Sequence, residues 1–484
     1  MGIVLKQSLN NTIVTYIGFA VGAINTLFLY TRFLTDEYYG LVSVILSYSA
    51  ILMPILAFGV PNTLVKYFSS FTDKKEQDSF LTLMLLLPLF LIGPMAISSY
   101  FAYELIGNFI SKTNPIVKGY VWYIFLIGMS MAYFEVFYSW SKVHMKTVFG
   151  NFMKEVFTRV GITILLVLVY YKVISVDTFL ITVVILHIIR MLIMKIYAYQ
   201  LRMPILSFNF PKNSKQILQY SALIILGGST AVVLLEVDKV MINHYIEIEN
   251  VAYYSVAIFI ATVISVPSRS MHQIAYPLTA EILNRNDKLE LKNLYHRSAL
   301  TLFIVSGLIY ILIILNLNEL YKLLPSEYAQ GFTIVFLIGL AKVYDAVLGN
   351  NNAILYNSNY YKALLLLGVF LAIITILFNM WLIPEFGLLG AAVASFTALF
   401  IYNTLKIVFV KVGFGILPFT SHMLKVFILL LALTLLFYFI EFPFHAIINI
   451  LIKSLLILAL YVTVLYKFNL SEDVNSVIKK FLRK

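Results

Sequence analysis

Long apolar runs separated by short polar turns are the main feature of the sequence. Residues 8–30, 38–65 and 79–103 contain no charged side chain. Each run exceeds the roughly 20 residues that a helix needs to cross the hydrocarbon core of a bilayer. Strands of a membrane barrel would be about half as long and would alternate in polarity. The pattern predicts an all-α integral membrane protein with about 14 transmembrane helices, at 8–30, 40–64, 80–103, 119–140, 155–171, 177–200, 217–243, 250–273, 296–316, 330–349, 362–383, 387–408, 422–440 and 446–466.

Composition and charge support this interpretation. The chain has 484 residues, of which 61% are hydrophobic and only 12% are charged. If the N-terminus lies in the cytoplasm and the helices alternate, 26 of the 35 Lys and Arg residues fall inside and seven fall outside. This distribution follows the positive-inside rule and predicts an even number of crossings with both termini in the cytoplasm. The net charge of +12 is therefore explained by topology, and we expect no nucleic-acid partner.

The sequence contains no cysteine, which excludes disulfides, thiol nucleophiles and cysteine metal sites. We find no zinc-protease helix motif, phosphate-binding Walker loop or nucleophile elbow. We therefore expect no catalytic residues, no metal site and no cofactor, and the protein is predicted not to be an enzyme. Energy for transport would then come from a partner, from consumption of the product, or from coupling to H⁺ or Na⁺.

A weak internal repeat appears when the sequence is shifted by 212 residues. Residues 31–44 then lie over 243–256, with Glu37 opposite Glu249 and Ser43 opposite Ser255. Six spans separate the copies, so both would face the same way, as in transporters built from parallel repeats. The alternative is that any two tight outer turns look alike. The repeat predicts two six-helix lobes, at 1–205 (spans 1–6) and 206–415 (spans 7–12), followed by spans 13 and 14 at 416–470 and a cytoplasmic amphipathic tail at 471–484.

Four segments resemble a known family. These are Arg32-Phe-Leu with Glu37-Tyr-Tyr-Gly-Leu, Asp238-Lys239, Ala252-Tyr-Tyr-Ser-Val, and the turn from Pro384 to Ala394. Together they resemble the Wzx-type oligosaccharide flippases of the multidrug/oligosaccharidyl-lipid/polysaccharide exporter superfamily. The resemblance implies two six-helix lobes around a central cavity, two additional C-terminal helices, and alternating access.

The same resemblance implies a substrate and a location. The substrate would be an undecaprenyl-pyrophosphate-linked oligosaccharide, moved from the cytoplasmic to the periplasmic leaflet of a bacterial inner membrane for surface polysaccharide, lipopolysaccharide or O-antigen assembly. Membrane lipids and the polymerase or glycosyltransferases of the pathway would be its partners. Related lipid II flippases carry several arginines in their first two spans, whereas this chain has only Arg32, which argues against a peptidoglycan precursor.

Charged residues inside spans are the candidate site residues, because such charges usually face protein or water. Five are expected in the cytoplasmic half of the membrane. We expect the cations among them, together with Arg32, to be candidates for binding pyrophosphate, although Arg190 and Lys342 could instead snorkel to the surface. The carboxylates could couple transport to an ion, or could be structural partners, as Glu135 would be for Arg190. The five residues are Glu135, Arg190, Arg269, Lys342 and Asp345.

A second charged group lies near the outer end of the seventh span. Asp238 is the residue that the family resemblance indicates, and we expect it to pair with Arg32 or Lys239 in a periplasmic gate. Contact with the sugar is the alternative. Aromatic and amide side chains are further glycan candidates, although most rings in a membrane protein pack between helices or lie at the interface. These candidates are Tyr30, Tyr48, Asn350, Asn351, Asn352 and Tyr356.

The tail from Ser471 has the pattern of a short interfacial helix, with Ser471 as its N-cap. Three other functions remain open at this stage. A multidrug or cation antiporter of the same superfamily would use a carboxylate for H⁺ or Na⁺. A membrane polysaccharide polymerase or glycosyltransferase would need a long outer loop, and the predicted outer loops are short. An assembly component without a transport pathway is the third.

Overall fold

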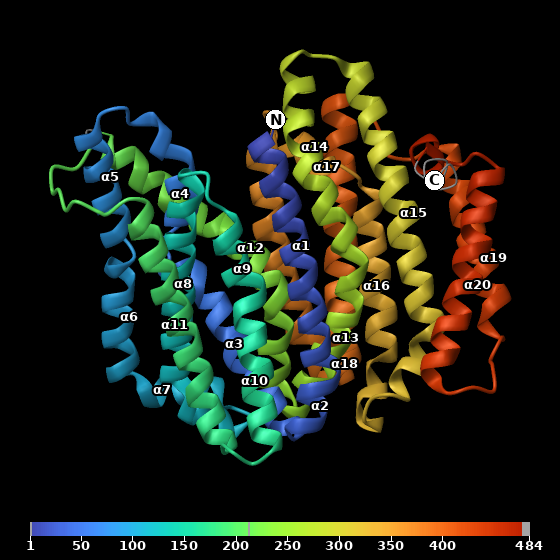
Figure 1. Cartoon of the computed structure of the whole chain (residues 1–484), viewed down its shortest axis with the longest axis horizontal. Coiled ribbons are helices and arrows are strands. Elements are labelled where there is room, and N and C mark those ends of the chain that lie inside the picture. Colours follow the sequence, from blue (N-terminus) through green and yellow to red (C-terminus); the bar gives the residue numbers. More distant parts are fainter. Residues whose placement is uncertain (1, 212, 477–484) are drawn as a thin grey trace. The chain divides into compact units, whose positions relative to one another are not determined.

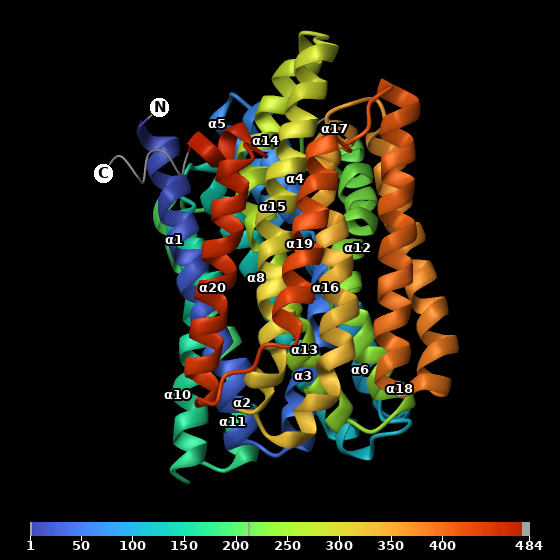
Figure 2. The ribbon, with the colours of Figure 1, turned by 90° about the vertical axis from the view of Figure 1, so that its right-hand side faces the viewer.

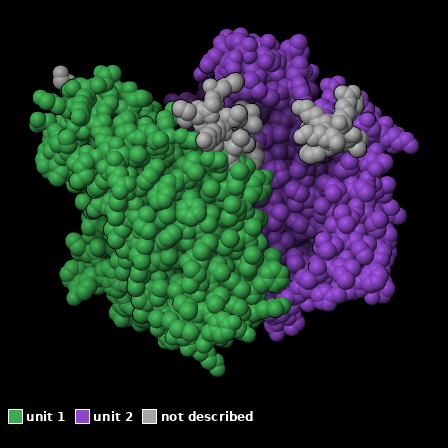
Figure 3. Space-filling model, viewed as in Figure 1, with its two compact units in different colours: residues 1–255 green, residues 256–484 purple. Residues whose placement is uncertain are grey.

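The computed structural model describes residues 2–211 and 213–476, and in these ranges the regular structure is entirely helical (Figure 1). The chain divides into two compact units, residues 1–255 and 256–484 (Figure 3). The helices up to the boundary are α1 (Gly2–Ile24), α2 (Tyr30–Phe33), α3 (Asp36–Leu56), α4 (Val60–Tyr67), α5 (Lys74–Leu86), α6 (Leu89–Phe101), α7 (Tyr103–Ile110), α8 (Val121–Val143), α9 (Val148–Phe152), α10 (Thr158–Tyr170), α11 (Val176–Leu201) and α12 (Ser214–Tyr245).

One helix, α13 (Glu249–Thr262), contains the boundary between the units. Short π-helical turns at Asn25–Leu29 and Met153–Phe157 join α1 to α2 and α9 to α10. The helices of the second unit are α14 (Val266–Asn284), α15 (Lys288–Tyr321), α16 (Phe332–Val347), α17 (Asn351–Tyr356), α18 (Tyr361–Phe414), α19 (Ser421–Tyr438) and α20 (Ala446–Lys467).

The protein is a multi-pass membrane protein, as the apolar runs predict. Eleven helices in the described part of the chain are long and apolar enough to cross a membrane. One of them, α18, contains two of the predicted spans, which a kink at Gly387 (φ 57°, ψ −132°) separates. Two other predicted spans correspond to α12 and to the continuous α9–α10 segment, which are not among the eleven. The total of fourteen therefore stays a prediction.

In the first unit, α8 is the central helix and packs against α3, α4 and α11. Its inner face carries Phe134 and Trp140, which are buried together with Phe80 of α5 and Met194 of α11. Burying large apolar side chains of this kind is worth about 1.5–3 kcal/mol each in water, and within lipid the gain comes from packing. The arrangement fixes the side chains on the remaining face of α8.

Helix α12 groups with the first unit because it packs against α3 and α4. The sequence places the corresponding span in a second lobe that starts at residue 206. The two units are defined by which helices contact each other, whereas the predicted lobes are defined by the sequence repeat. The lobe boundaries at 205/206 and 415/416 therefore stay predictions.

In the second unit, α15 packs against α14, α16, α19 and α20. The last two helices lie beside α15 in both views (Figures 1 and 2). Val426 of α19 and Ile457 of α20 are fully buried against Phe303 and Ile311 of α15. Predicted spans 13 and 14 are thus attached to the second unit through α15, which corresponds to predicted span 9 of the chain.

Candidate functional site

The predicted span 40–64 is broken at residues 57–59. Phe58 and Gly59 have positive φ angles of 50° and 66°, which separate α3 from α4. A Cβ atom at Gly59 would lie 2.2 Å from the carbonyl oxygen of Ser221, so a larger residue would require the backbone to move. The prediction of one continuous helix over 40–64 is therefore wrong. Such breaks are tolerated in membranes where the backbone is covered by protein or lines a cavity.

A cavity of about 220 Å³ lies at this break, which we name the α4–α8 cavity. Its polar lining on α8 consists of Glu135, Ser139 and Lys142, which are four and three positions apart and so share one helix face. Every lining residue belongs to the first unit. The other lining residues are Met53, Pro54, Ala57, Gly59, Pro61, Asn62 and Val65 around the break, Lys154 between α9 and α10, and Ile224, Ile225 and Val232 of α12.

The charges in the α4–α8 cavity are two lysines and one carboxylate. The Nζ atom of Lys154 lies 2.6 Å from Oε1 of Glu135, and the lysine side chain is 44% exposed against 15% for the glutamate. The Nζ atom of Lys142 lies 3.9 Å from the centre of the Tyr138 ring. The two lysines carry one positive charge more than the single carboxylate balances, and Lys154 is the more accessible partner of the ion pair.

His144 follows α8 and lies outside the membrane-spanning segments. Burial, and then the charge of Arg202, lower the pKa of His144, so its ring is neutral near pH 7. The positive charge at this end of α8 therefore comes from lysine side chains, which stay charged over the physiological pH range.

Arg190 lies behind this cavity on α11. Its side chain is only 7% exposed, which rules out the predicted alternative that it snorkels to the membrane surface. Its guanidinium carbon lies 4.3 Å from the centre of the Phe134 ring, and Nη1 donates a hydrogen bond of 3.2 Å to Thr158. Nε has no hydrogen-bond partner in the described part of the structure. Arg190 interacts electrostatically with Glu135, although the ion pair of Glu135 is with Lys154.

The second unit contains a related charge pair. Lys406 of α18 is 1% exposed, and its Nζ atom lies 3.4 Å from Oδ1 of Asp345 on α16. The same ammonium donates to the side-chain oxygen of Asn352 at 3.1 Å and lies 4.5 Å from the centre of the Tyr402 ring. In this pair the carboxylate is the more exposed partner. Its side chain is 39% exposed, whereas the lysine is buried.

Two of the predicted glycan candidates hold the second unit together instead. Asn350 and Asn351 are both fully buried. The Asn350 amide donates to Thr279 at 2.9 Å and accepts from Ser298 at 3.1 Å. The Asn351 amide donates to the Tyr295 hydroxyl at 2.8 Å. Their burial means that these two side chains cannot meet a glycan in this structure.

The other predicted cations lie apart from the α4–α8 cavity. Arg32, at the end of α2, and Arg269, on α14, are exposed. Lys342 is half-buried on α16 and interacts electrostatically with Asp345. None of the three lines the α4–α8 cavity. Their role in binding pyrophosphate stays a prediction.

The predicted gate residues lie near the end of α12. Asp238 is buried and accepts a hydrogen bond of 2.5 Å from the Tyr254 hydroxyl. The Nζ atom of Lys239 lies 2.8 Å from Oε2 of Glu236, which also accepts from Ser47 of α3 at 2.7 Å. Among the described residues, Lys239 therefore forms its ion pair with Glu236. The gate itself stays a prediction.

Replacement of Asp238 by Asn is expected to lower translocation about fivefold while leaving membrane insertion intact. Asn keeps the shape but removes the charge that strengthens the bond from Tyr254, a loss of about 1 kcal/mol. Translocation rates in proteoliposomes, normalised to inserted protein, test this expectation. Tyr254→Phe removes the same bond from the other side and should have a similar effect. Unchanged rates in both variants would exclude a gating role for this contact.

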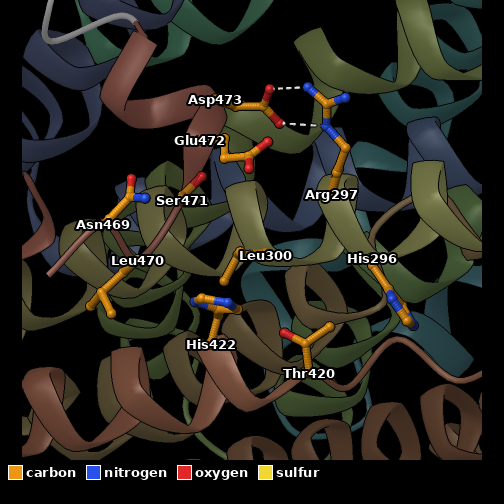
Figure 4. A pocket seen from close by; sticks show the side chains of 10 residues that line it. All are labelled: His296, Arg297, Leu300, Thr420, His422, Asn469, Leu470, Ser471, Glu472 and Asp473. Atoms are coloured by element: carbon orange, nitrogen blue, oxygen red, sulfur yellow. Dashed lines mark hydrogen bonds and ion pairs between the residues drawn. The ribbon is translucent and has the colours of Figure 1, made fainter.

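A second cavity, of about 350 Å³, lies in the second unit where the C-terminal segment meets α15 and α19 (Figure 4). Arg297 and Asp473 form an ion pair with two hydrogen bonds at its wall. The arginine charge is thus already neutralised, and the acidic Glu472 lines the same space. This cavity is therefore less suited to an anion than the α4–α8 cavity. Its other lining residues are His296, Leu300, Thr420, His422, Asn469, Leu470 and Ser471.

The predicted helix cap at Ser471 is confirmed. The hydroxyl of Ser471 accepts a hydrogen bond of 3.4 Å from the backbone N–H of Val474, and residues 472–476 are helical. Residues 477–484 of the predicted tail lie outside the described residues, so its membrane contact stays a prediction.

Three lysines that line the α4–α8 cavity or pair with Asp345 were not predicted as site residues. They are Lys142, Lys154 and Lys406, which charge counting assigns to the ends of spans or to loops. A signal existed for Lys142, which follows Glu135 by seven positions on one helix face. For Lys406 the signal is a charge within an apolar run of α18.

Comparisons with known proteins agree with this architecture. Residues 4–283 match the family described as "Polysaccharide biosynthesis protein". The structure is similar to the lipid II flippase MurJ in an inward closed conformation, with a TM-score of 0.74 and 16% identity, covering 95% of this chain and 99% of that chain. At this identity the likeness shows the fold alone. No curated protein sequence matches the chain.

Two further transporters of the MOP superfamily share the fold as well. An inward-facing multidrug resistance MATE family transporter of the MOP superfamily gives a TM-score of 0.63 at 12% identity, covering 84% of this chain and 98% of that chain. A MOP superfamily transporter from Pyrococcus furiosus gives 0.57 at 13% identity, covering 86% and 97%. The fold is therefore common to flippases and to multidrug transporters, and the residues of the site must distinguish them.

Proposed function

Because the chain belongs to the polysaccharide biosynthesis protein family, we propose that it is a flippase for undecaprenyl-pyrophosphate-linked oligosaccharide. It would move this substrate from the cytoplasmic to the periplasmic leaflet of a bacterial inner membrane, for surface polysaccharide or O-antigen assembly. Both termini would lie in the cytoplasm, and the pathway's glycosyltransferases and polymerase would supply and consume the substrate. The proposal involves translocation alone and assigns no catalytic step.

The observation that carries the proposal is the excess of lysine charge in the lining of the α4–α8 cavity. Lys142 and Lys154 both line it, and only Glu135 opposes them. A lysine ammonium binds phosphate oxygens as a point charge. The N-terminal end of α4 lies at the same cavity, and helix N-termini favour anionic groups.

The Glu135–Lys154 pair suggests how binding could be linked to the transport cycle. A pyrophosphate that approaches Lys154 competes with the carboxylate for the same ammonium, which now lies 2.6 Å from Glu135. When phosphate takes the ammonium, the carboxylate loses its ion pair and keeps only the weaker influence of Lys142 and Arg190. A half-buried carboxylate that loses its ion pair takes up H⁺ or a cation more readily. Glu135 is therefore our candidate coupling residue for H⁺ or Na⁺.

A multidrug or cation antiporter is the second candidate function, since the fold is shared with MATE transporters. An antiporter that binds organic cations needs accessible negative charge in its binding cavity. The α4–α8 cavity presents the opposite polarity, because two lysines and one carboxylate line it and Lys154 is more exposed than Glu135. This charge favours the flippase.

The leaflet distribution of the substrate tests the proposal. Purified protein is reconstituted into liposomes that contain lipid-linked oligosaccharide extracted from the source cells, and the glycan reachable from outside is followed with time. We expect transfer between leaflets in protein-containing liposomes and none in protein-free ones. Absence of transfer, combined with protein-dependent movement of an organic cation, would replace the flippase by the antiporter. In cells, depletion should cause the lipid-linked glycan to accumulate on the inner leaflet.

A further inference from the structure

Four tyrosine and histidine rings in the second unit lie around the exposed carboxylate of Asp345. The rings of Tyr276 on α14 and Tyr356 at the end of α17 have centres 6.1 Å apart, and His272 lies edge-on to Tyr276 at 5.8 Å. Tyr276 and Tyr402 both interact electrostatically with Asp345. We name these residues the tyrosine–carboxylate cluster: His272, Tyr276, Asp345, Tyr356, Tyr402 and Lys406.

The helices bring this cluster together from four separate elements. In the second unit, α14 packs against α17, and α18 packs against both α16 and α17. The buried amides of Asn350 and Asn351 fix the start of α17 to α14 and α15. The rings are therefore held on a rigid support, although Tyr356 itself is 57% exposed.

Lys406 contacts the Asp345 carboxylate and leaves part of that carboxylate exposed. Lys406 approaches from the buried side, with one contact to Oδ1 of the carboxylate and another to Asn352. The exposed part of the carboxylate remains available to groups from outside. A carboxylate in this position is an acceptor for hydroxyl groups, with which it forms short, charge-assisted hydrogen bonds.

The α14 helix adds donors on the same face. Arg269, His272 and Tyr276 are three and four positions apart, so they form one stripe along the helix. Arg269 is exposed, and His272 is half-buried, with its Nδ1 atom without a hydrogen-bond partner in the described part of the structure. The titratable groups that act on Asp345 are Lys406 of α18, Lys342 of α16 and His272 of α14.

We propose that the tyrosine–carboxylate cluster binds the sugar units of the transported glycan. The inference rests on the proposed function and assigns to it a sugar subsite whose residues all belong to the second unit. Aromatic faces can stack on the C–H faces of sugar rings, while Asp345 accepts hydrogen bonds from sugar hydroxyls. A few polar groups among aromatic rings is the usual composition of a small-molecule site.

An organic cation is the other ligand that aromatic rings and a carboxylate can hold. The neighbouring charges disfavour it here, because Asp345 is surrounded by Lys406 and Lys342, with Arg269 on the same helix stripe as Tyr276. These positive charges do not repel a neutral ligand that carries hydroxyl groups. The cluster therefore favours sugar over cation.

Two substrates that differ only in their glycan test the inference in the reconstituted full-length protein. One is the extracted lipid-linked oligosaccharide, and the other is the same lipid pyrophosphate bearing a single sugar. Tyr356→Ala and Tyr276→Ala are expected to lower transfer of the oligosaccharide about fivefold relative to the single-sugar substrate, because stacking is lost. Tyr356 is exposed, so its replacement should leave the fold intact. Tyr438→Ala, at an exposed position of α19, is the matched control and should change neither rate.

The outcomes separate the two proposals. If wild-type protein transfers neither substrate, the proposed function fails. If wild-type protein transfers both but the Tyr276 and Tyr356 variants keep the wild-type ratio of rates, the sugar subsite is wrong and the flippase stands. If Tyr276→Phe, which keeps the ring, restores the ratio lost in Tyr276→Ala, the stacking argument is supported. Transfer of tetraphenylphosphonium that depends on Tyr276 would overturn the sugar subsite in favour of a cation site.

Discussion

Simultaneous replacement of Lys142 and Lys154 by Gln is expected to lower translocation of the lipid-linked glycan by more than about tenfold. Each lysine would contribute a charge-assisted contact to phosphate worth about 1.5–3 kcal/mol, and 1.4 kcal/mol corresponds to a factor of ten. The rate in proteoliposomes measures the effect. Lys146→Gln provides a matched control, because Lys146 lies in the adjoining loop, is exposed and does not line the cavity.

Binding of inorganic pyrophosphate to purified protein gives the same prediction a second readout. The double lysine variant should bind this probe more weakly by a similar factor. Glu135→Gln should bind it more tightly than wild type, because the carboxylate that competes for Lys154 is gone. Equal affinity in wild type, the double lysine variant and Glu135→Gln would contradict the assignment of the α4–α8 cavity as the phosphate site.

Replacement of Asp345 by Asn is expected to destabilise the protein by about 2 kcal/mol, and more than replacement of Lys406 by Met. Asp345→Asn leaves a buried ammonium without its carboxylate, although the contact with Asn352 persists. Lys406→Met leaves a carboxylate that is 39% exposed and can still be hydrated. Removing one partner of a buried pair usually costs about 3–5 kcal/mol, and partial exposure reduces this figure.

Thermal unfolding in detergent tests this order of stabilities. The double variant Asp345→Asn with Lys406→Met should recover most of the stability lost in Asp345→Asn, because no charge is then left buried. A double variant as unstable as the sum of both single variants would show that the two side chains do not act as a pair. The comparison depends on relative values, so it does not require full reversibility of unfolding.

Apolar run length was sufficient to predict the fold class. A run of about twenty apolar residues is typical of a helix that crosses a lipid bilayer, and the sequence contains many such runs. The break at Phe58 and Gly59 was missed because the residues around it are themselves apolar. Its local signal was the sequence Gly59-Val-Pro61, where a glycine and a proline follow each other closely within a predicted helix.

The carboxylates of the site were predictable, but their partners were not. Glu135 and Asp345 stand out because a charge inside a span is rare. Lys154 and Lys406 reach them from other helices, 19 and 61 residues further along the chain, and sequence position does not reveal such contacts. Asn350 and Asn351 look suitable for sugar in the sequence, and only their burial identifies them as structural.

Glu135 with Arg190 and Asp345 with Lys406 occupy similar places in the two predicted halves, although the ion pair of Glu135 is with Lys154. Asp345 follows Glu135 by 210 positions, and Lys406 follows Arg190 by 216, close to the shift of 212 between the sequence copies. Each carboxylate lies on the fourth span of its predicted half and each cation on the sixth, and those helices pack against each other in both cases. An ancestral carboxylate–cation pair that later diverged would explain why the two halves now present opposite charges.

The interrupted second span also has a consequence for biosynthesis. Once α3 has entered the bilayer, the eight-residue α4 is too short to span it. The amides of Ala57 and Phe58 bond to carbonyls of α3, so the break can form before the rest of the unit is made. Thr63, which bonds the Gly59 carbonyl and the Ser221 hydroxyl, completes the arrangement only when α12 is present. Thr63 and Ser221 are 158 residues apart in the chain, so this link between α4 and α12 can form only after α12 has been synthesised.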